Sequence, residues 1–153
     1  MPEILALMTK QKLSAQVAIT NNATLASAGT LFGLLTSTIA AGQSMKIRYW
    51  IPFTVGATGG IRVQIVVPAG GTLFNASFLL ANTVAPAVVT ATQVASAAFT
   101  NAVANAGTHF LIIDVEVVNG STAGNVDLQI AQNTVDANTL TVLRGAFADV
   151  NKF

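Results

Sequence analysis

Few side chains in this sequence have the types and the spacing that catalysis requires. His109 is the single histidine of the 153-residue chain. A catalytic dyad or triad pairs such a base with an activated nucleophile, and serine and threonine are so abundant here that this pairing carries no information. A zinc site needs three or four ligands, whereas the chain has one histidine and no cysteine. We therefore expect His109 to be a structural or exposed residue at the start of a strand.

Asp114 and Glu116 form a pair of carboxylates at a suggestive spacing. Residues i and i+2 of a strand share one face and lie about 7 Å apart, and two carboxyl groups at roughly that separation can hydrolyse a glycosidic bond. The same Asp-x-Glu pattern is also common on solvated or ion-paired strands, and Lys46, Arg48 or Arg62 would supply the cation. We favour the ion-paired interpretation, and we predict that the protein is not an enzyme and uses no cofactor.

Three basic residues and two others occupy every second position of two predicted strands that should pair as a hairpin. This spacing should place all five on one outward face: Lys46, Arg48, Trp50, Arg62 and Gln64. Basic side chains beside an aromatic ring can bind nucleic acid or acidic sugars. We favour an interface with another subunit or a shell over ligand binding, with an ordinary surface as the further alternative. The net charge of +1 argues against nucleic acid as a partner.

The element that should position these residues is a β-hairpin over residues 44–71. Apolar residues recur at every second position on both sides of the Gly-rich connector 56–60, as in a hairpin with one face in a core. We therefore expect one sandwich core to contain Tyr49, Ile51, Phe53, Ile61, Val63 and Ile65.

Shorter stretches of the same kind run through the rest of the chain. Alternating or β-branched residues predict strands near 13–20, 31–39, 72–80, 108–118, 125–130 and 140–147. The Ala-rich segment 81–107 should add one or two more, with a helical turn near 102–106 as an alternative. About eight to ten short strands without a convincing helix predict an all-β sandwich or barrel.

The surface of such a domain should be unusually poor in charge. Hydrophobic residues make up 52% of the chain and charged residues 8%, against about 25% charged residues in a typical soluble domain. Residues 110–113 are apolar on both faces of their predicted strand. Large, weakly polar surfaces usually mark interfaces, so we expect self-association. No apolar run approaches the roughly 18 residues of a membrane span, and we expect no membrane partner.

The order of several short motifs resembles a known family. Arg48-Tyr49-Trp50 precedes a Thr/Ala/Gly turn and a strand that ends at Pro68-Ala69. A later Gly-bounded Asn-x-Asp/Gln strand is followed by the ending Thr141–Phe147. Over residues 31–147 this order resembles the trimeric jelly-roll domains of bacteriophage virion proteins, whose architecture is similar to the tumour-necrosis-factor fold. The Gly-Ser that such domains usually carry near the C-terminus is Gly145-Ala146 here.

This resemblance implies a jelly-roll-type antiparallel β-sandwich that assembles as a homotrimer on a virus particle. A capsid decoration (cement) protein and the receptor- or glycan-binding knob of a fibre are both familiar placements. The short chain carries no shaft sequence, which favours decoration. The implied role is a trimeric structural protein on the outer surface of a bacteriophage capsid, bound to the major capsid protein.

We divide the chain into an N-terminal arm, residues 1–12, and a jelly-roll domain, residues 13–153. The arm contains no glycine and mixes apolar with charged side chains. That composition suits an extended segment that orders on a neighbouring subunit, and a frayed chain end is the alternative. The residues expected to contact partners are Ile4, Leu5, Leu7, Met8, Lys10 and Lys12 in the arm, and Arg48, Trp50, Phe110 and Ile112 on the predicted sheet.

Overall fold

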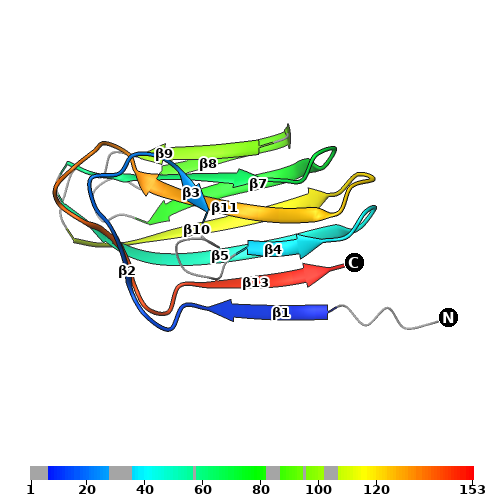
Figure 1. The fold of residues 1–153 in the computed structure, drawn as a ribbon, viewed down its shortest axis with the longest axis horizontal. Coiled ribbons are helices and arrows are strands. Elements are labelled where there is room, and N and C mark those ends of the chain that lie inside the picture. Colours follow the sequence, from blue (N-terminus) through cyan, green and yellow to red (C-terminus); the bar gives the residue numbers. More distant parts are fainter. Residues whose placement is uncertain (1–6, 28–35, 57, 82–86, 95, 102–106) are drawn as a thin grey trace.

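The protein is an all-β sandwich of two antiparallel sheets (Figure 1), as the sequence predicts. The computed structural model describes residues 7–27, 36–56, 58–81, 87–94, 96–101 and 107–153. These residues form thirteen strands and no helix. The strands are β1 (Leu7–Lys12), β2 (Val17–Ile19), β3 (Ala26–Ser27), β4 (Thr36–Ile39), β5 (Ser44–Val55), β6 (Ile61–Val66), β7 (Thr72–Ala81), β8 (Ala87–Val94), β9 (Ser96–Asn101), β10 (Gly107–Val118), β11 (Gly124–Gln132), β12 (Leu140–Val142) and β13 (Phe147–Lys152).

The strand order within the two sheets is that of a jelly roll. Sheet A has the order β1-β13-β5-β10-β7-β8, with β12 joining β2 to β5, and sheet B has the order β3-β11-β6-β9, with β4 also on β11. We number β1, β4, β5, β6, β9, β10, β11 and β13 from one to eight along the chain. The sheets then read 1-8-3-6 and 2-7-4-5, the two interlocked Greek keys of the jelly roll.

The structure has three strands beyond the ten that the sequence predicts at most. Strand β1 lies in the predicted arm, β3 has only two residues, and the single strand expected near 140–147 is in fact two, β12 and β13, with a turn over 143–146 between them. Strands β7 and β8 form a hairpin inserted between the fourth and fifth jelly-roll strands, and this hairpin extends sheet A beyond β10. The two strands expected within 81–107 are β8 and β9, while the alternative helical turn at 102–106 lies outside the described residues.

The sequence predicts that the two strands within 44–71 pair as a hairpin, and this pairing is wrong. The prediction of which side of each strand is buried is confirmed. Strand β5 belongs to sheet A, where it pairs with β10, β12 and β13. Strand β6 belongs to sheet B and pairs with β9 and β11. The connector 56–60 therefore carries the chain from one sheet to the other, and the two apolar faces meet across the core.

Apolar side chains from both sheets fill the space between them. The six residues predicted for the core are fully buried, with exposed fractions of 0%: Tyr49, Ile51, Phe53, Ile61, Val63 and Ile65. Alternation drives this arrangement, since every second residue of a strand faces the same side. Burial also raises the pKa of Tyr49, whose hydroxyl has no hydrogen-bond partner in the described part of the chain.

The long sides of the sandwich differ from each other. On one side β8 and β9, separated by a single residue, carry the chain from sheet A to sheet B. On the other side β1 is the edge strand of sheet A, and β4 borders sheet B. The sandwich is therefore continuous on one side and open on the other.

Half of the predicted N-terminal arm belongs to the sandwich. Residues 7–12 form strand β1, which pairs with β13 from Leu7↔Lys152 to Lys12↔Phe147. This pairing joins residues 7–12 to sheet A, and the sequence did not reveal it because pairing with a strand at the far end of the chain leaves no local pattern. Ile4 and Leu5 of the predicted arm lie outside the described residues.

Candidate protein interface on the outer face of sheet A

The side chains of sheet A that point away from the core form rows across neighbouring strands. One row contains Phe147, Trp50, Ile112 and Leu79, aligned by the registers of β13, β5, β10 and β7. We call this set the apolar row. The next two rows are the ionic rows, which contain Lys10, Asp149, Arg48 and Asp114, and then Asn151, Lys46, Glu116 and Asn75.

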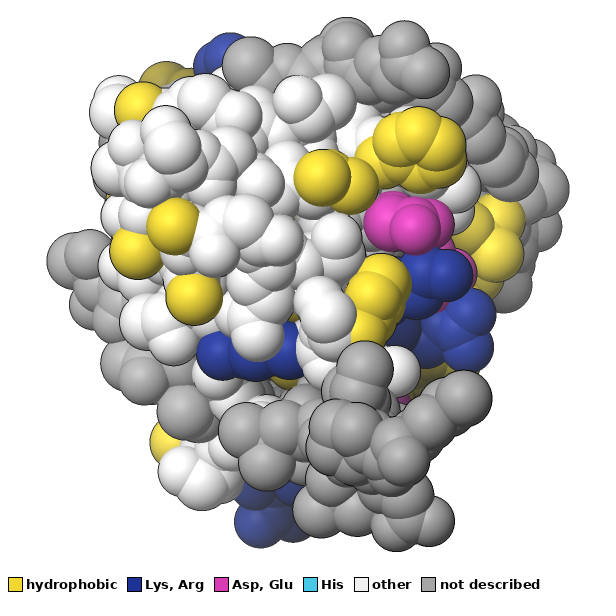
Figure 2. Space-filling view, turned by 90° about the vertical axis from the view of Figure 1, so that its right-hand side faces the viewer, with side chains coloured by type: hydrophobic (Ala, Val, Ile, Leu, Met, Phe, Trp, Pro, Cys, Tyr) yellow, Lys and Arg dark blue, Asp and Glu magenta, His cyan; other side chains and the backbone are white. Residues whose placement is uncertain are grey.

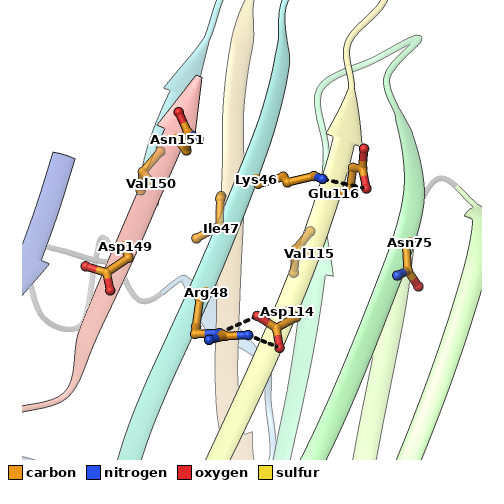
Figure 3. Close-up of a pocket in the computed structure, with 10 residues that line it drawn as sticks. All are labelled: Lys46, Ile47, Arg48, Asn75, Asp114, Val115, Glu116, Asp149, Val150 and Asn151. Atoms are coloured by element: carbon orange, nitrogen blue, oxygen red, sulfur yellow. Dashed lines mark hydrogen bonds and ion pairs between the residues drawn. The ribbon is translucent and has the colours of Figure 1, made fainter. Parts of the chain in front are cut away.

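Opposite charges alternate along the ionic rows and pair within the chain (Figure 3). The Arg48 guanidinium donates to both carboxylate oxygens of Asp114, with Nε–Oδ1 at 2.6 Å and Nη2–Oδ2 at 3.1 Å. Lys46 Nζ lies 3.6 Å from Glu116 Oε2, and Lys10 Nζ lies 3.5 Å from Asp149 Oδ1. This confirms the ion-paired interpretation of the Asp-x-Glu motif.

The ion pairs border a shallow depression of about 380 Å³ on this face. Its floor includes Ile47 and Val115, and Asn75 and Asn151 lie along its sides (Figure 3). Hydrogen bonding to Asp114, together with its charge, raises the pKa of Arg48 above the ordinary value. The site is therefore a charged but internally neutralised surface.

Aromatic rings meet in and beside the apolar row. The ring of Trp50 stacks on that of Phe147, with centroids 6.4 Å apart and planes 8° apart. It also contacts Phe110, with centroids 5.5 Å apart and an angle of 50°. Lys10 Nζ lies 4.7 Å from the centroid of the Phe147 ring, a cation–π geometry that connects the apolar row to the first ionic row.

A β-bulge adds another exposed aromatic residue. On β10, Glu116 pairs with Asn75 but Val117 pairs with Leu73, so Phe74 is the extra residue of β7. The bulge interrupts the alternation, and Phe74 and Asn75 are both exposed. Because β7 has β10 on one side and β8 on the other, an exposed side chain on it must lie on the outer face.

Exposed apolar side chains concentrate on this face. Among the described residues, six large hydrophobic side chains are exposed, and five of them belong to strands of sheet A or to its C-terminal continuation: Phe74, Leu79, Phe110, Val118 and Phe153. Figure 2 views the end of the sandwich that carries the loops after β4, β6 and β10. On the right of this view, acidic side chains lie among basic and apolar ones, and further basic and apolar side chains are scattered over the rest, which is mostly uncharged.

The structure brings together most of the predicted partner-binding residues. Lys10, Lys12, Arg48, Trp50, Phe110 and Ile112 all belong to β1, β5 and β10, and alternation places them on the outer face of sheet A. Leu7 and Met8 are in the backbone of β1, and their side chains lie outside the description. The sequence analysis missed Phe147, Asp149 and Leu79, since only the strand pairing aligns them with Trp50 and Arg48.

Arg62 and Gln64 are not on this face, contrary to the sequence prediction. They lie on β6 of sheet B, on the other side of the sandwich, because β5 and β6 do not pair. His109 is 2% exposed and lies beside Phe53, with ring centroids 5.5 Å apart, in agreement with a structural role at the start of its strand.

The described residues contain no group of three or more His, Cys, Asp or Glu side chains that could hold a metal ion. Within the same part of the chain, no helix has the length and apolarity needed to cross a membrane.

Comparison with known proteins gives matches among solved structures only. No protein-family model matches the sequence, and no curated protein matches it. The structure of infectious bursal disease virus strain Gt shares 10% identity and a TM-score of 0.28. The VP2 subviral particle of the same virus shares 14% identity and a TM-score of 0.25, and strain Gx shares 12% and 0.28. Each match covers 97% of this chain but only 40–42% of the viral chain, and a likeness at this level carries no argument about function.

Proposed function

We propose that this chain is a structural virion protein, a homotrimeric decoration (cement) protein that binds the major capsid protein on the outer surface of a bacteriophage capsid. The observation that carries the proposal is the outer face of sheet A. It holds five of the six exposed large hydrophobic side chains among the described residues, in a chain with only 8% charged residues. The jelly-roll strand order and the motif resemblance support the same role.

The chemistry of this face suits association with a second copy of the chain. Burying exposed apolar surface contributes about 25 cal/mol for each Å² removed from water. Three carboxylates of the face already have a cation within 4 Å: Asp114, Glu116 and Asp149. The face can therefore be covered without leaving these charges unpaired, which limits the desolvation cost. We expect the trimer to bury more than about 2,000 Å² in total, as obligate interfaces do.

A trimer that contacts several shell subunits would stabilise the shell by multivalency. Once one protomer is bound, its neighbours meet their own sites at a high effective concentration, so modest contacts combine into strong attachment. This is a geometric mechanism, and it needs no catalytic group, cofactor, nucleic acid or membrane.

A fibre knob that binds a receptor or glycan is the second candidate, and one observation favours it. The half-buried Trp50 and the exposed Phe110 form an aromatic surface beside the Arg48–Asp114 pair. Rings next to fixed polar groups are a common arrangement in ligand sites. Electron microscopy of the particle before and after removal of this protein distinguishes the two roles, because a regular lattice of knobs indicates decoration and a single appendage indicates a fibre.

Light scattering on matched variants tests the interface. The wild-type chain should have the mass of three protomers at micromolar concentration, and Phe110→Asp should be monomeric, since it buries an unpaired charge in the interface. Asn125→Asp is the control, because it adds the same charge to an exposed position of β11 in sheet B. A stable wild-type monomer would rule out the trimer, and a trimeric Phe110→Asp variant would place the interface elsewhere.

A further inference from the structure

About a third of the chain carries no charge. Residues 63–113 contain no Lys, Arg, Asp or Glu, so all thirteen charged residues come before or after this stretch. The stretch includes the whole of strands β7, β8 and β9. Figure 1 shows these three strands together along the upper side of the sandwich, with β1 and β13 along the lower side. The continuous side of the sandwich is therefore built from strands without a charged residue.

The ionic rows of sheet A show the same change from one side to the other. The charges of the first row end on β10 at Asp114, and those of the second row end on β10 at Glu116. The register continues both rows onto β7 and β8, where the residues have hydroxyl or amide side chains: Ser77 and Thr90 in the first row, Asn75 and Thr92 in the second. Because uncharged polar groups cost far less to remove from water than charges do, the β7–β8 end of these rows is the end suited to burial.

The two long sides of the sandwich also differ in how their edge strands are protected. Proteins keep exposed edges from pairing with other chains by placing charges on them, lysine above all. On the open side, β1 carries Lys10 and Lys12, and Gln11 Nε2 donates to the backbone oxygen of Thr36 on β4 at 3.2 Å. On the continuous side, β8 pairs only with β7 and β9 only with β6 among the described strands. Neither β8 nor β9 contains a lysine or a proline.

Exposed apolar side chains adjoin these unprotected edges. Phe74 and Leu79 belong to β7, and Phe110 on β10 is paired with Ala81 of β7. Leu79 is in turn paired with Val88, so the apolar row reaches the edge strand β8. The exposed apolar residues and the uncharged edges thus form one area. A second copy of the chain fits this area, because two surfaces without charges can cover each other without leaving any charge unpaired.

We propose that the homotrimer forms along the continuous sides of three copies, with β8 of each copy facing β9 of the next. This inference rests on the proposed function and names the part of the chain that makes its subunit contact. Contact between two different edges is heterologous and closes as a ring of three, whereas β8 against β8 would close as a dimer. Each copy then shields the edges of its neighbours, and the lysine-bearing edge β1 lies on the outside of the ring.

Matched lysine substitutions on the two edge strands of sheet A test the proposal by light scattering. Thr90→Lys places a charge on β8, and in the trimer it brings three unpaired like charges into the interface. This variant should have the mass of one protomer at the micromolar concentration at which the wild type has the mass of three. Thr9→Lys adds the same charge to an exposed position of β1 and should remain a trimer.

Cross-linking decides the question even if circular dichroism shows that Thr90→Lys does not fold. The chain has no cysteine, so Thr90→Cys introduces a single reactive thiol, and a short bifunctional maleimide can join it only to another copy. Two-chain products should form from this variant, because the proposal places the β8 strands of three copies around one axis. Thr9→Cys, on the opposite edge, should give none at the same protein concentration.

The outcomes separate this inference from the proposed function. If the wild type is a trimer but Thr90→Lys is also a trimer, or Thr90→Cys gives no two-chain product, the subunit contact lies elsewhere and the inference is overturned while the trimer stands. A wild-type dimer that cross-links through Thr90→Cys would show β8 against β8 and would also overturn it. A wild-type monomer contradicts the proposed trimer itself, and the inference with it.

Discussion

The carboxylates on the two outer faces of the sandwich have different kinds of partner. On sheet A, each of Asp114, Glu116 and Asp149 lies beside a lysine or arginine, and exposed aromatic residues flank the pairs. On sheet B, Asp127 accepts hydrogen bonds from the hydroxyls of Ser27, at 2.6 Å, and Thr36, at 2.8 Å, and has no cation within ion-pair distance in the described chain. None of the exposed large hydrophobic side chains of the described residues belongs to a strand of sheet B.

This difference indicates what each face is suited to do. Hydroxyl groups that stabilise a carboxylate locally belong to a surface that remains in water. Paired charges between exposed aromatic residues suit a surface that another protein covers, since little charge is left to desolvate unpaired. The faces therefore differ both in their exposed apolar residues and in the partners of their carboxylates.

The largest effects are expected beneath the faces, where the two sheets should behave alike. Ile51→Ala in β5 and Ile65→Ala in β6 each remove a fully buried side chain and should lower the free energy of unfolding by about 2–5 kcal/mol. Chemical denaturation measures both, and Val66→Ala, at a half-buried outward position of β6, is the control. A change of a few tenths of a kcal/mol at Ile51 or Ile65 would contradict the shared core.

Removing β1 should damage sheet A selectively. Deletion of residues 1–12 uncovers the edge of β13, which pairs with β1 over six positions, and removes Lys10 from the first ionic row. We expect the melting temperature to fall by several degrees. Deletion of residues 1–6 keeps β1 and should leave the melting temperature unchanged.

The same two deletions test whether the predicted arm binds the shell. Co-sedimentation with undecorated particles should show weaker attachment for the 1–6 deletion if the arm binds the shell. Attachment as tight as that of the full chain would mean that the folded domain makes the contact. A 1–12 deletion as stable as the wild type would show that β1 contributes little to sheet A.

The smallest changes in unfolding free energy are expected for the carboxylates of the two outer faces, and their salt dependence tests directly whether the faces differ. Asp127→Asn weakens two charge-assisted hydrogen bonds and should cost about 1–3 kcal/mol of unfolding free energy, with little dependence on salt. Asp114→Asn breaks an exposed ion pair and should cost at most about 1 kcal/mol, with the difference shrinking as salt is added. Denaturation at low and high salt measures both. Equal costs with equal salt dependence would mean that the faces do not differ in this way.

The sequence by itself determined the class of fold and which side of each long strand is buried. Alternation in 44–55, 61–66 and 107–118 reports the face of every residue, because the side chains of a strand point to opposite sides in turn. It also identified Arg48, Trp50, Phe110 and Ile112 as outward residues of a surface with unusual composition. The prediction that Asp114 and Glu116 are ion-paired followed from the same alternation.

Strand pairing was decided only by the tertiary structure. Apolar residues recur at every second position whether the chain after β5 turns back within the same sheet or crosses to the opposite sheet. The alternation therefore could not distinguish the two connections, and Arg62 and Gln64 were assigned to the wrong face. Residues 7–12 were expected in an arm because their partner, β13, lies at the far end of the chain and leaves no local pattern. Phe147 and Asp149 align with Trp50 and Arg48 for the same reason, since register across strands depends on long-range packing that no local spacing records.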